Sequence, residues 1–227
     1  MGYSRKEEIA ELRKQKRKAK ASKKRSENVR CELVRFLIVC EGEKTEPFYF
    51  ETLINSHVSA VREVTIKGEG KGTVALIDKT CEIRDELERN NAMCFDQVWA
   101  VFDKDDFDDF NEAISRAKDC NIRCAWSNEA FELWYCLHFE HLTSGISRSD
   151  YITKIEEHIR SKAGKKDFRY RKGCKDIYKL LQQYGSEEFA KKNAKALRKL
   201  HFGTNYSKHN PCTKVDLLVE ELEQYSI

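Results

Sequence analysis

The sequence predicts an α/β fold with a mostly parallel sheet flanked by helices, a helical C-terminal portion and a basic N-terminal arm. Three observations lead to this prediction. Short apolar segments rich in β-branched residues are followed by segments in which apolar residues recur at helical spacing. The two patterns alternate from residue 34 to residue 139, the order typical of an open parallel sheet. Only 2 prolines and 10 glycines interrupt the 227 residues, which favours helices joined by short connections.

The strand predictions depend on apolar content and alternation. The run Val34 to Cys40 is almost continuously apolar, as expected for a parallel strand buried on both faces. The strands are expected at 34–40, 61–67, 97–102 and 121–126. Each is followed by a helical pattern; the first begins near Thr45, a residue suited to cap a helix that has Pro47 in its first turn. The other helices of this part are expected at 73–88, 108–119 and 130–139.

Beyond Thr143 the patterns are helical only. Helices are expected at 151–161, 175–184, 187–201 and 214–224. The chain therefore divides into a basic arm over 1–29, helical or disordered, an α/β domain over 30–142 and a helical region over 143–227.

The basic arm stands out by its charge. Residues 1–30 hold 12 of the 42 Lys and Arg but only 4 of the 38 Asp and Glu. Such an arm on a mildly acidic body is typical of an interaction tail, and nucleic acid is the commonest target because neutralised phosphates release counterions. The alternative is a solvated helix whose charge provides solubility, and composition does not separate the two.

The composition indicates a folded and very polar protein, with 35% charged and 11% aromatic residues. No stretch approaches the roughly 20 apolar residues of a membrane span. The polar, basic N-terminus also has no apolar segment of the kind found in signal peptides. We therefore expect a cytoplasmic protein without a membrane partner, and the oligomeric state stays open.

Carboxylates gather where two of the predicted strands end. Glu41 ends the first strand, with Glu46 close behind, and Asp103 and Asp105 follow the third. In an extended segment residues two apart project to the same side, so both aspartates can reach one cation. Hard oxygen ligands suit Mg²⁺ or Mn²⁺. Capping of the following helices is the alternative, and we favour it for Asp108 and Asp109 but not for the strand-end residues.

Further candidates flank this centre. Glu132 is a tentative second-metal ligand, with pairing to a local base as the alternative, and Glu46 is a tentative ligand of the same kind. Tyr170 and Tyr206 are candidates for stacking on exposed bases. Several cations can meet substrate phosphates, unless they form only a solvated cationic turn: Lys44, Lys165, Lys166, Arg169, Arg171 and Lys172.

A Glu-Gly pair after the first strand, followed at a later strand by Asp-x-Asp, resembles the Toprim domain of topoisomerases, bacterial primases and overcoming-lysogenization-defect nucleases. Four motifs in order, at 39–50, 101–107, 127–134 and 210–215, more specifically resemble the RloB-like family over about residues 33–224. This resemblance places the Toprim glutamate on Glu41 and the acidic pair on Asp103 and Asp105. These three are the expected catalytic residues and metal ligands, with Glu41 acting either as a ligand or, if it is not a ligand, as a proton acceptor. It implies a metal-dependent nuclease of prokaryotic restriction or abortive-infection gene clusters, often encoded beside an ATPase.

The resulting hypothesis is an Mg²⁺-dependent (or Mn²⁺-dependent) nuclease that hydrolyses phosphodiester bonds of DNA or RNA, tRNA included, in anti-phage defence, with a partner ATPase. The alternative is an effector that binds nucleic acid or an ATPase, hydrolyses nothing and holds a structural cation. A transferase of the primase type is a third interpretation, disfavoured because no second nucleotide-binding module is evident in the sequence.

Overall fold

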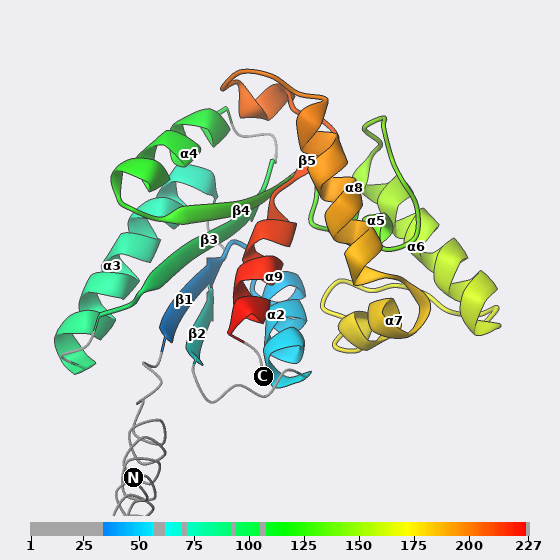
Figure 1. Cartoon of the computed structure of the whole chain (residues 1–227), viewed down its shortest axis with the longest axis horizontal. Helices are drawn as coiled ribbons and strands as arrows, with labels where there is room; N and C mark the ends of the chain where they lie inside the picture. Colours follow the sequence, from blue (N-terminus) through cyan, green and yellow to red (C-terminus); the bar gives the residue numbers. More distant parts are fainter. Residues whose placement is uncertain (1–33, 57–61, 70–71, 92–93, 105–107, 226–227) are drawn as a thin grey trace, which may run out of the picture. The chain divides into compact units, whose positions relative to one another are not determined.

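A five-stranded sheet organises the chain in the computed structural model, which describes residues 34–56, 62–69, 72–91, 94–104 and 108–225 (Figure 1). The strand order is β2-β1-β3-β4-β5. The strands are β1 (Val34–Cys40), β2 (Arg62–Gly68), β3 (Gln97–Asp103), β4 (Arg123–Asn128) and β5 (Cys212–Thr213). The strands β1 to β4 run parallel to one another and β5 pairs antiparallel with β4, so the predicted mostly parallel α/β sheet is confirmed. The predicted basic arm and Asp105 lie outside the described residues.

Helices cover both faces of this sheet (Figure 1). They are α2 (Thr45–Ser56), α3 (Thr73–Asn91), α4 (Phe110–Asp119), α5 (Glu132–Leu137), α6 (Arg148–Ala163), α7 (Ile177–Tyr184), α8 (Glu187–Lys199), the 3₁₀ helix η1 (Tyr206–Lys208) and α9 (Val215–Gln224). Alternate residues of β1 divide between two cores: Phe36 and Ile38 pack with α2 and the later helices, and Leu37 and Val39 pack with α3 and α4. Burial on both faces explains why this strand is almost wholly apolar.

The start of β4 differs from the prediction. The strand begins at Arg123 rather than at residue 121 and continues to Asn128. Asn121 has a positive φ of 56°, a conformation that asparagine tolerates better than most residues. The Ile122 N–H then donates to the Ala117 carbonyl oxygen at 2.7 Å. These two residues therefore close α4, and the apolar side chain that suggested a strand is buried in a turn.

The expected role of Asp109 is also corrected. The helix that follows it begins at Phe110, and no Asp109 side-chain bond caps that helix. Its carboxylate instead accepts from the Val74 N–H at 3.1 Å and from the Thr73 hydroxyl, both in the first turn of α3. Asp109 thus caps a helix that begins 36 residues before it, a relation that local sequence spacing does not reveal.

The region beyond Thr143 is mainly helical, as predicted, but it also contributes η1 and β5. Two-residue β5 pairs with Ser127 and Asn128 and so joins this region to the sheet. The described residues accordingly belong to one compact unit. Within the part that the structure describes, no helix combines the length and the apolar character needed to cross a membrane.

Candidate metal centre

The ends of β1 and β3 bring Glu41 and Asp103 together, as the parallel sheet requires. The Glu41 N–H donates to the Val101 carbonyl oxygen at 2.8 Å, which continues the ladder one residue beyond β1. The Glu41 side-chain oxygen Oε2 then accepts from the Asp103 N–H at 3.0 Å. One oxygen of Glu41 therefore holds the backbone at the end of β3 and helps to set the position of Asp103.

A pocket of about 250 Å³ opens beside these strand ends. It collects carboxylates from three separate segments: Glu46 from the first turn of α2, Asp103 from β3 and Glu132 from the start of α5. Its full lining is Gly42, Glu43, Lys44, Thr45, Glu46, Asp103, Phe131, Glu132 and Lys172. Three of the acidic residues selected from the sequence thus share one small pocket.

Asp103 is buried, with 8% of its surface exposed. Its Oδ2 accepts from Arg148 Nη2 at 3.2 Å, whereas its buried Oδ1 has no hydrogen-bond partner among the described residues. Burial raises the pKa of Asp103 well above its usual value, and the nearby Glu46 and Glu132 raise it further. Arg148 opposes this rise because its guanidinium favours the ionised carboxylate.

Glu46, like Asp103, is a buried carboxylate with a raised pKa. Its side chain is buried, and Oε2 has no hydrogen-bond partner in the described part of the chain. Burial raises the pKa of Glu46, Glu132 adds to the rise, and Lys172 and Arg148 lower it. A Cβ atom built on Gly42 would stand 2.1 Å from Glu46 Oε2, so the glycine of the Glu-Gly motif leaves the space that the carboxylate fills.

Glu132 occupies the first position of α5 and is 2% exposed. Its Oε1 accepts from the Tyr170 hydroxyl at 3.2 Å. Tyr170 is itself buried, and its ring lies edge-on to Tyr135 at a centroid distance of 6.2 Å. The prediction that Tyr170 stacks on nucleic-acid bases is therefore wrong: it orients a carboxylate of the site instead.

The loop after α6 carries the predicted cationic cluster, and it delivers one member to the pocket. Lys172 lines the pocket together with Lys44. The next residue, Gly173, has a φ of 75°, and its N–H donates to Thr45 Oγ1 at 3.3 Å, which ties the loop to the start of α2. The remaining members are exposed and absent from the pocket lining: Lys165, Lys166, Arg169 and Arg171. Arg169 also pairs with Glu156 at 3.5 Å.

The described residues alone do not form a finished metal site: among them no group of three or more His, Cys, Asp or Glu side chains could hold an ion. Asp105 lies outside them. They nevertheless fit a cation, because Glu46 Oε2 and Asp103 Oδ1 are buried oxygens without partners and the carboxylates repel one another. Hard oxygen donors of this kind suit Mg²⁺ or Mn²⁺.

Arg148 is the site residue that sequence reasoning missed. It opens α6, whose start is set by a capping box in which the Ser147 side chain accepts from the Asp150 N–H and the Asp150 side chain accepts from the Ser147 N–H. That Ser-x-x-Asp spacing is a sequence signal for the start of a helix. No local sequence pattern indicates that Arg148 lies beside Asp103, which is 45 residues away in the chain.

The fold and the pocket define a class: α/β proteins that gather carboxylates and lysines at the carboxyl ends of parallel strands. Within that class, a family model described as RloB-like protein matches residues 36–222. The chain belongs to the RloB-like family. No curated protein sequence and no solved structure matches the chain.

Proposed function

We propose that the protein is a Toprim-type nuclease that hydrolyses phosphodiester bonds of DNA or RNA with Mg²⁺ or Mn²⁺. One observation carries the proposal: Asp103 and Glu46 bring to one pocket buried carboxylate oxygens that have no hydrogen-bond partner among the described residues, and two lysines also line that pocket. Such an arrangement suits a divalent cation and a phosphate group at the same place. The order of Glu41, Asp103 and Asp105 along the chain supports the Toprim assignment.

In this proposal Asp103, Glu46 and Asp105 hold the cation, and Glu132 is a further candidate ligand. The cation supplies charge that polarises the phosphodiester and lowers the pKa of an attacking water. Lys44 and Lys172 bind the phosphate oxygens and counter the charge that develops on them. Glu41 positions Asp103 through the bond from the Asp103 N–H, and Tyr170 holds the Glu132 carboxylate in its orientation.

Membership in the RloB-like family supports the remaining parts of the proposal. The nuclease acts in prokaryotic anti-phage defence in the cytoplasm, and a co-encoded ATPase is its partner. The basic arm contributes to nucleic-acid binding through its lysines and arginines.

The test uses purified full-length protein with plasmid, single-stranded DNA and tRNA. Each substrate is incubated with Mg²⁺, Mn²⁺, Ca²⁺ or EDTA, with and without the co-encoded ATPase. We expect cleavage with Mg²⁺ or Mn²⁺ and none with Ca²⁺, which prefers longer bonds and a looser geometry. Asp103→Asn should abolish cleavage. Asp119→Asn, the same exchange at an exposed position at the end of α4, should retain it.

Thermal unfolding with the same ions separates the nuclease from the non-catalytic alternative. Stabilisation by all three ions, without cleavage of any substrate even with the ATPase present, would favour an effector with a structural cation. Cleavage that persists in both EDTA and Asp103→Asn would disprove the proposed centre.

A further inference from the structure

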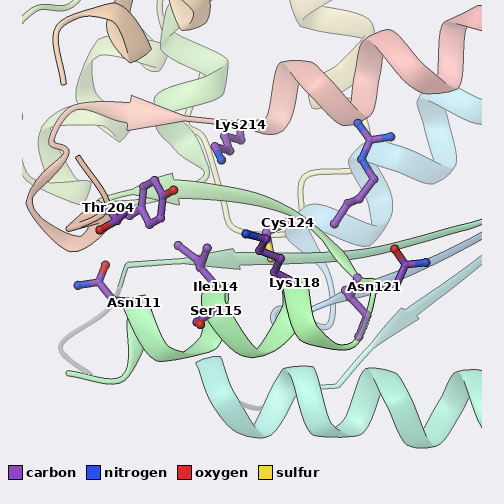
Figure 2. Close-up of a pocket in the computed structure, with 11 residues that line it drawn as sticks. Asn111, Ile114, Ser115, Lys118, Asn121, Cys124, Thr204 and Lys214 are labelled. Atoms are coloured by element: carbon purple, nitrogen blue, oxygen red, sulfur yellow. The ribbon is translucent and has the colours of Figure 1, made fainter. Parts of the chain in front are cut away.

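A second and larger pocket runs along the outer edge of β4, between α4, the segment that leads into η1, and the start of α9 (Figure 2). Its volume is about 690 Å³. Its lining is Asn111, Ile114, Ser115, Lys118, Asn121, Ile122, Arg123, Cys124, Thr204, Tyr206 and Lys214. None of these residues lines the carboxylate pocket, so this β4-edge groove is a separate feature.

The groove exists because β5 is short. It pairs with β4 only at Ser127 and Asn128, and the Lys214 N–H donates to the Trp126 carbonyl oxygen at 2.9 Å just before them. Peptide groups two residues apart face the same edge of a strand, so the Cys124 peptide group faces the groove. In the described part of the chain no strand pairs with Cys124 on this side. Its N–H and C=O are therefore available to a ligand.

The charge of the groove has one sign. Lys118, Arg123 and Lys214 line it, and the lining contains no acidic residue. Arg123 is already engaged, because it pairs with Glu221 and its guanidinium lies 4.2 Å from the centre of the Trp99 ring. The two lysines are left as the cations that can meet a ligand.

Lys214 is the more unusual of the two lysines. Its side chain is half-buried, with the ammonium 5.6 Å from the Trp126 ring centre and 5.2 Å from that of Tyr206. Among the described residues no ion pair joins it to a carboxylate. Burial lowers the pKa of Lys214, and the nearby Arg198 charge lowers it further, although Asp216 opposes the shift. A bound anion beside the ammonium would favour its charged form.

The polar side chains of the groove also differ along its length. Figure 2 shows Asn111 and Thr204 at one end, Lys118 near the middle with Lys214 above it, and Asn121 toward the other end. The Asn111 amide is held in place, because its Nδ2 donates to Asn205 Oδ1 at 2.8 Å and to Ser207 Oγ at 3.2 Å, and its Oδ1 accepts from the Ser207 N–H at 3.0 Å. The remaining lone pair of Oδ1 can accept a hydrogen bond from a ligand. A ligand with an uncharged, hydrogen-bonding end and an anionic end fits this arrangement.

We propose that the β4-edge groove binds a phosphorylated nucleoside, with its phosphate between Lys118 and Lys214 and its base toward Asn111 and Tyr206. The volume lies within the roughly 300 to 1,000 Å³ of small-molecule sites. Lysine is a common phosphate ligand, and aromatic rings accept bases of any sequence. The phosphorylated nucleoside is either a free nucleotide or the 5′-phosphorylated end of a strand. This binding needs no hydrolysis, so it stands apart from the proposed nuclease activity.

Isothermal titration of the full chain in EDTA tests the proposal, since chelation removes any cation that could hold phosphate at the carboxylate pocket. The probes are AMP, ATP, adenosine, an acidic peptide and a short oligonucleotide with or without a 5′-phosphate. We expect saturable binding of a phosphorylated probe and weaker binding of its unphosphorylated counterpart. Lys214→Gln should weaken binding about tenfold, as loss of one charged contact implies. Lys195→Gln, an exposed change on α8 outside the groove, should leave it within about twofold.

A matched pair on α4 keeps the test decisive even if Lys214→Gln does not fold. Ser115 lies on the exposed side of α4 and lines the groove. Ser115→Glu introduces a negative charge and should abolish binding, whereas Ser115→Gln adds a side chain of the same size and should weaken it less. Binding of AMP or ATP identifies a free nucleotide as the ligand. Binding of the phosphorylated oligonucleotide alone identifies a strand end.

Three results would overturn the proposal. The first is the absence of saturable binding for every phosphorylated probe. The second is equal binding by Ser115→Glu and Ser115→Gln. The third is tighter binding of the acidic peptide than of any phosphorylated probe, which would assign the groove to a protein partner.

Discussion

Replacement of Gly42 by alanine tests the geometry of the carboxylate pocket directly. The new Cβ would stand 2.1 Å from Glu46 Oε2 and 2.9 Å from the carbon of the same carboxylate, whereas ordinary contacts begin near 3.4 Å. The carboxylate must therefore move by more than 1 Å, out of the place where it faces Asp103 and Glu132. Forced overpacking costs about 1 to 3 kcal/mol. Alanine also reduces the conformational entropy of the unfolded chain, which stabilises the folded protein by about 0.4 to 1 kcal/mol.

The expected net loss of stability in Gly42→Ala is therefore at most about 2.6 kcal/mol, and it is smaller if the end of the Glu46 side chain moves aside easily. For a chain of this size the upper value corresponds to a fall of about 5 to 10 °C in the melting temperature. The assay is urea unfolding followed by tryptophan fluorescence in a double-mutant cycle with Glu46→Ala, which removes the clashing carboxylate. In that background Gly42→Ala should cost nothing. Equal destabilisation in both backgrounds would refute the packing of Glu46 against Gly42.

Three further predictions concern charge. Since burial raises the pKa of Asp103 and of Glu46, the folded chain keeps protons that the unfolded chain loses near pH 4. The stability of the metal-free protein should therefore fall as pH rises above about 4. In Asp103→Asn this fall should be shallower, and at pH 7 the variant should melt at a temperature no lower than wild type. A fall of stability with pH that is steeper in Asp103→Asn than in wild type would contradict this. Arg148→Gln should destabilise the metal-free protein by about 1 to 3 kcal/mol and enlarge the stabilisation by Mg²⁺, measured by thermal unfolding. Deleting residues 1–30 should weaken nucleic-acid binding and reduce its log-log salt slope by about 0.9 per lost phosphate contact on duplex DNA; an unchanged slope would assign the arm to solubility or to a protein partner.

Strand and helix periodicity predicted most of the architecture because those signals are local. The β1 segment is apolar at consecutive positions since both of its faces are buried, and β3 follows the same rule. The failures came where a distant segment decides the outcome. Asp109 caps α3 rather than its own helix. Tyr170, which flanking cations made a candidate for base stacking, is buried on Glu132.

By itself, the sequence determined the α/β class, the positions of Glu41 and Asp103 at strand ends, and the four motifs of the RloB-like family. These features follow from residue order, because parallel strands put their carboxyl ends at one edge of a sheet. Only the tertiary structure decided which charges share the pocket. It selected Lys172 from the cationic cluster and added Arg148, since both depend on how the segments after Thr143 fold back over the strand ends. It also left the outer edge of β4 open, because two-residue β5 is too short to cover it.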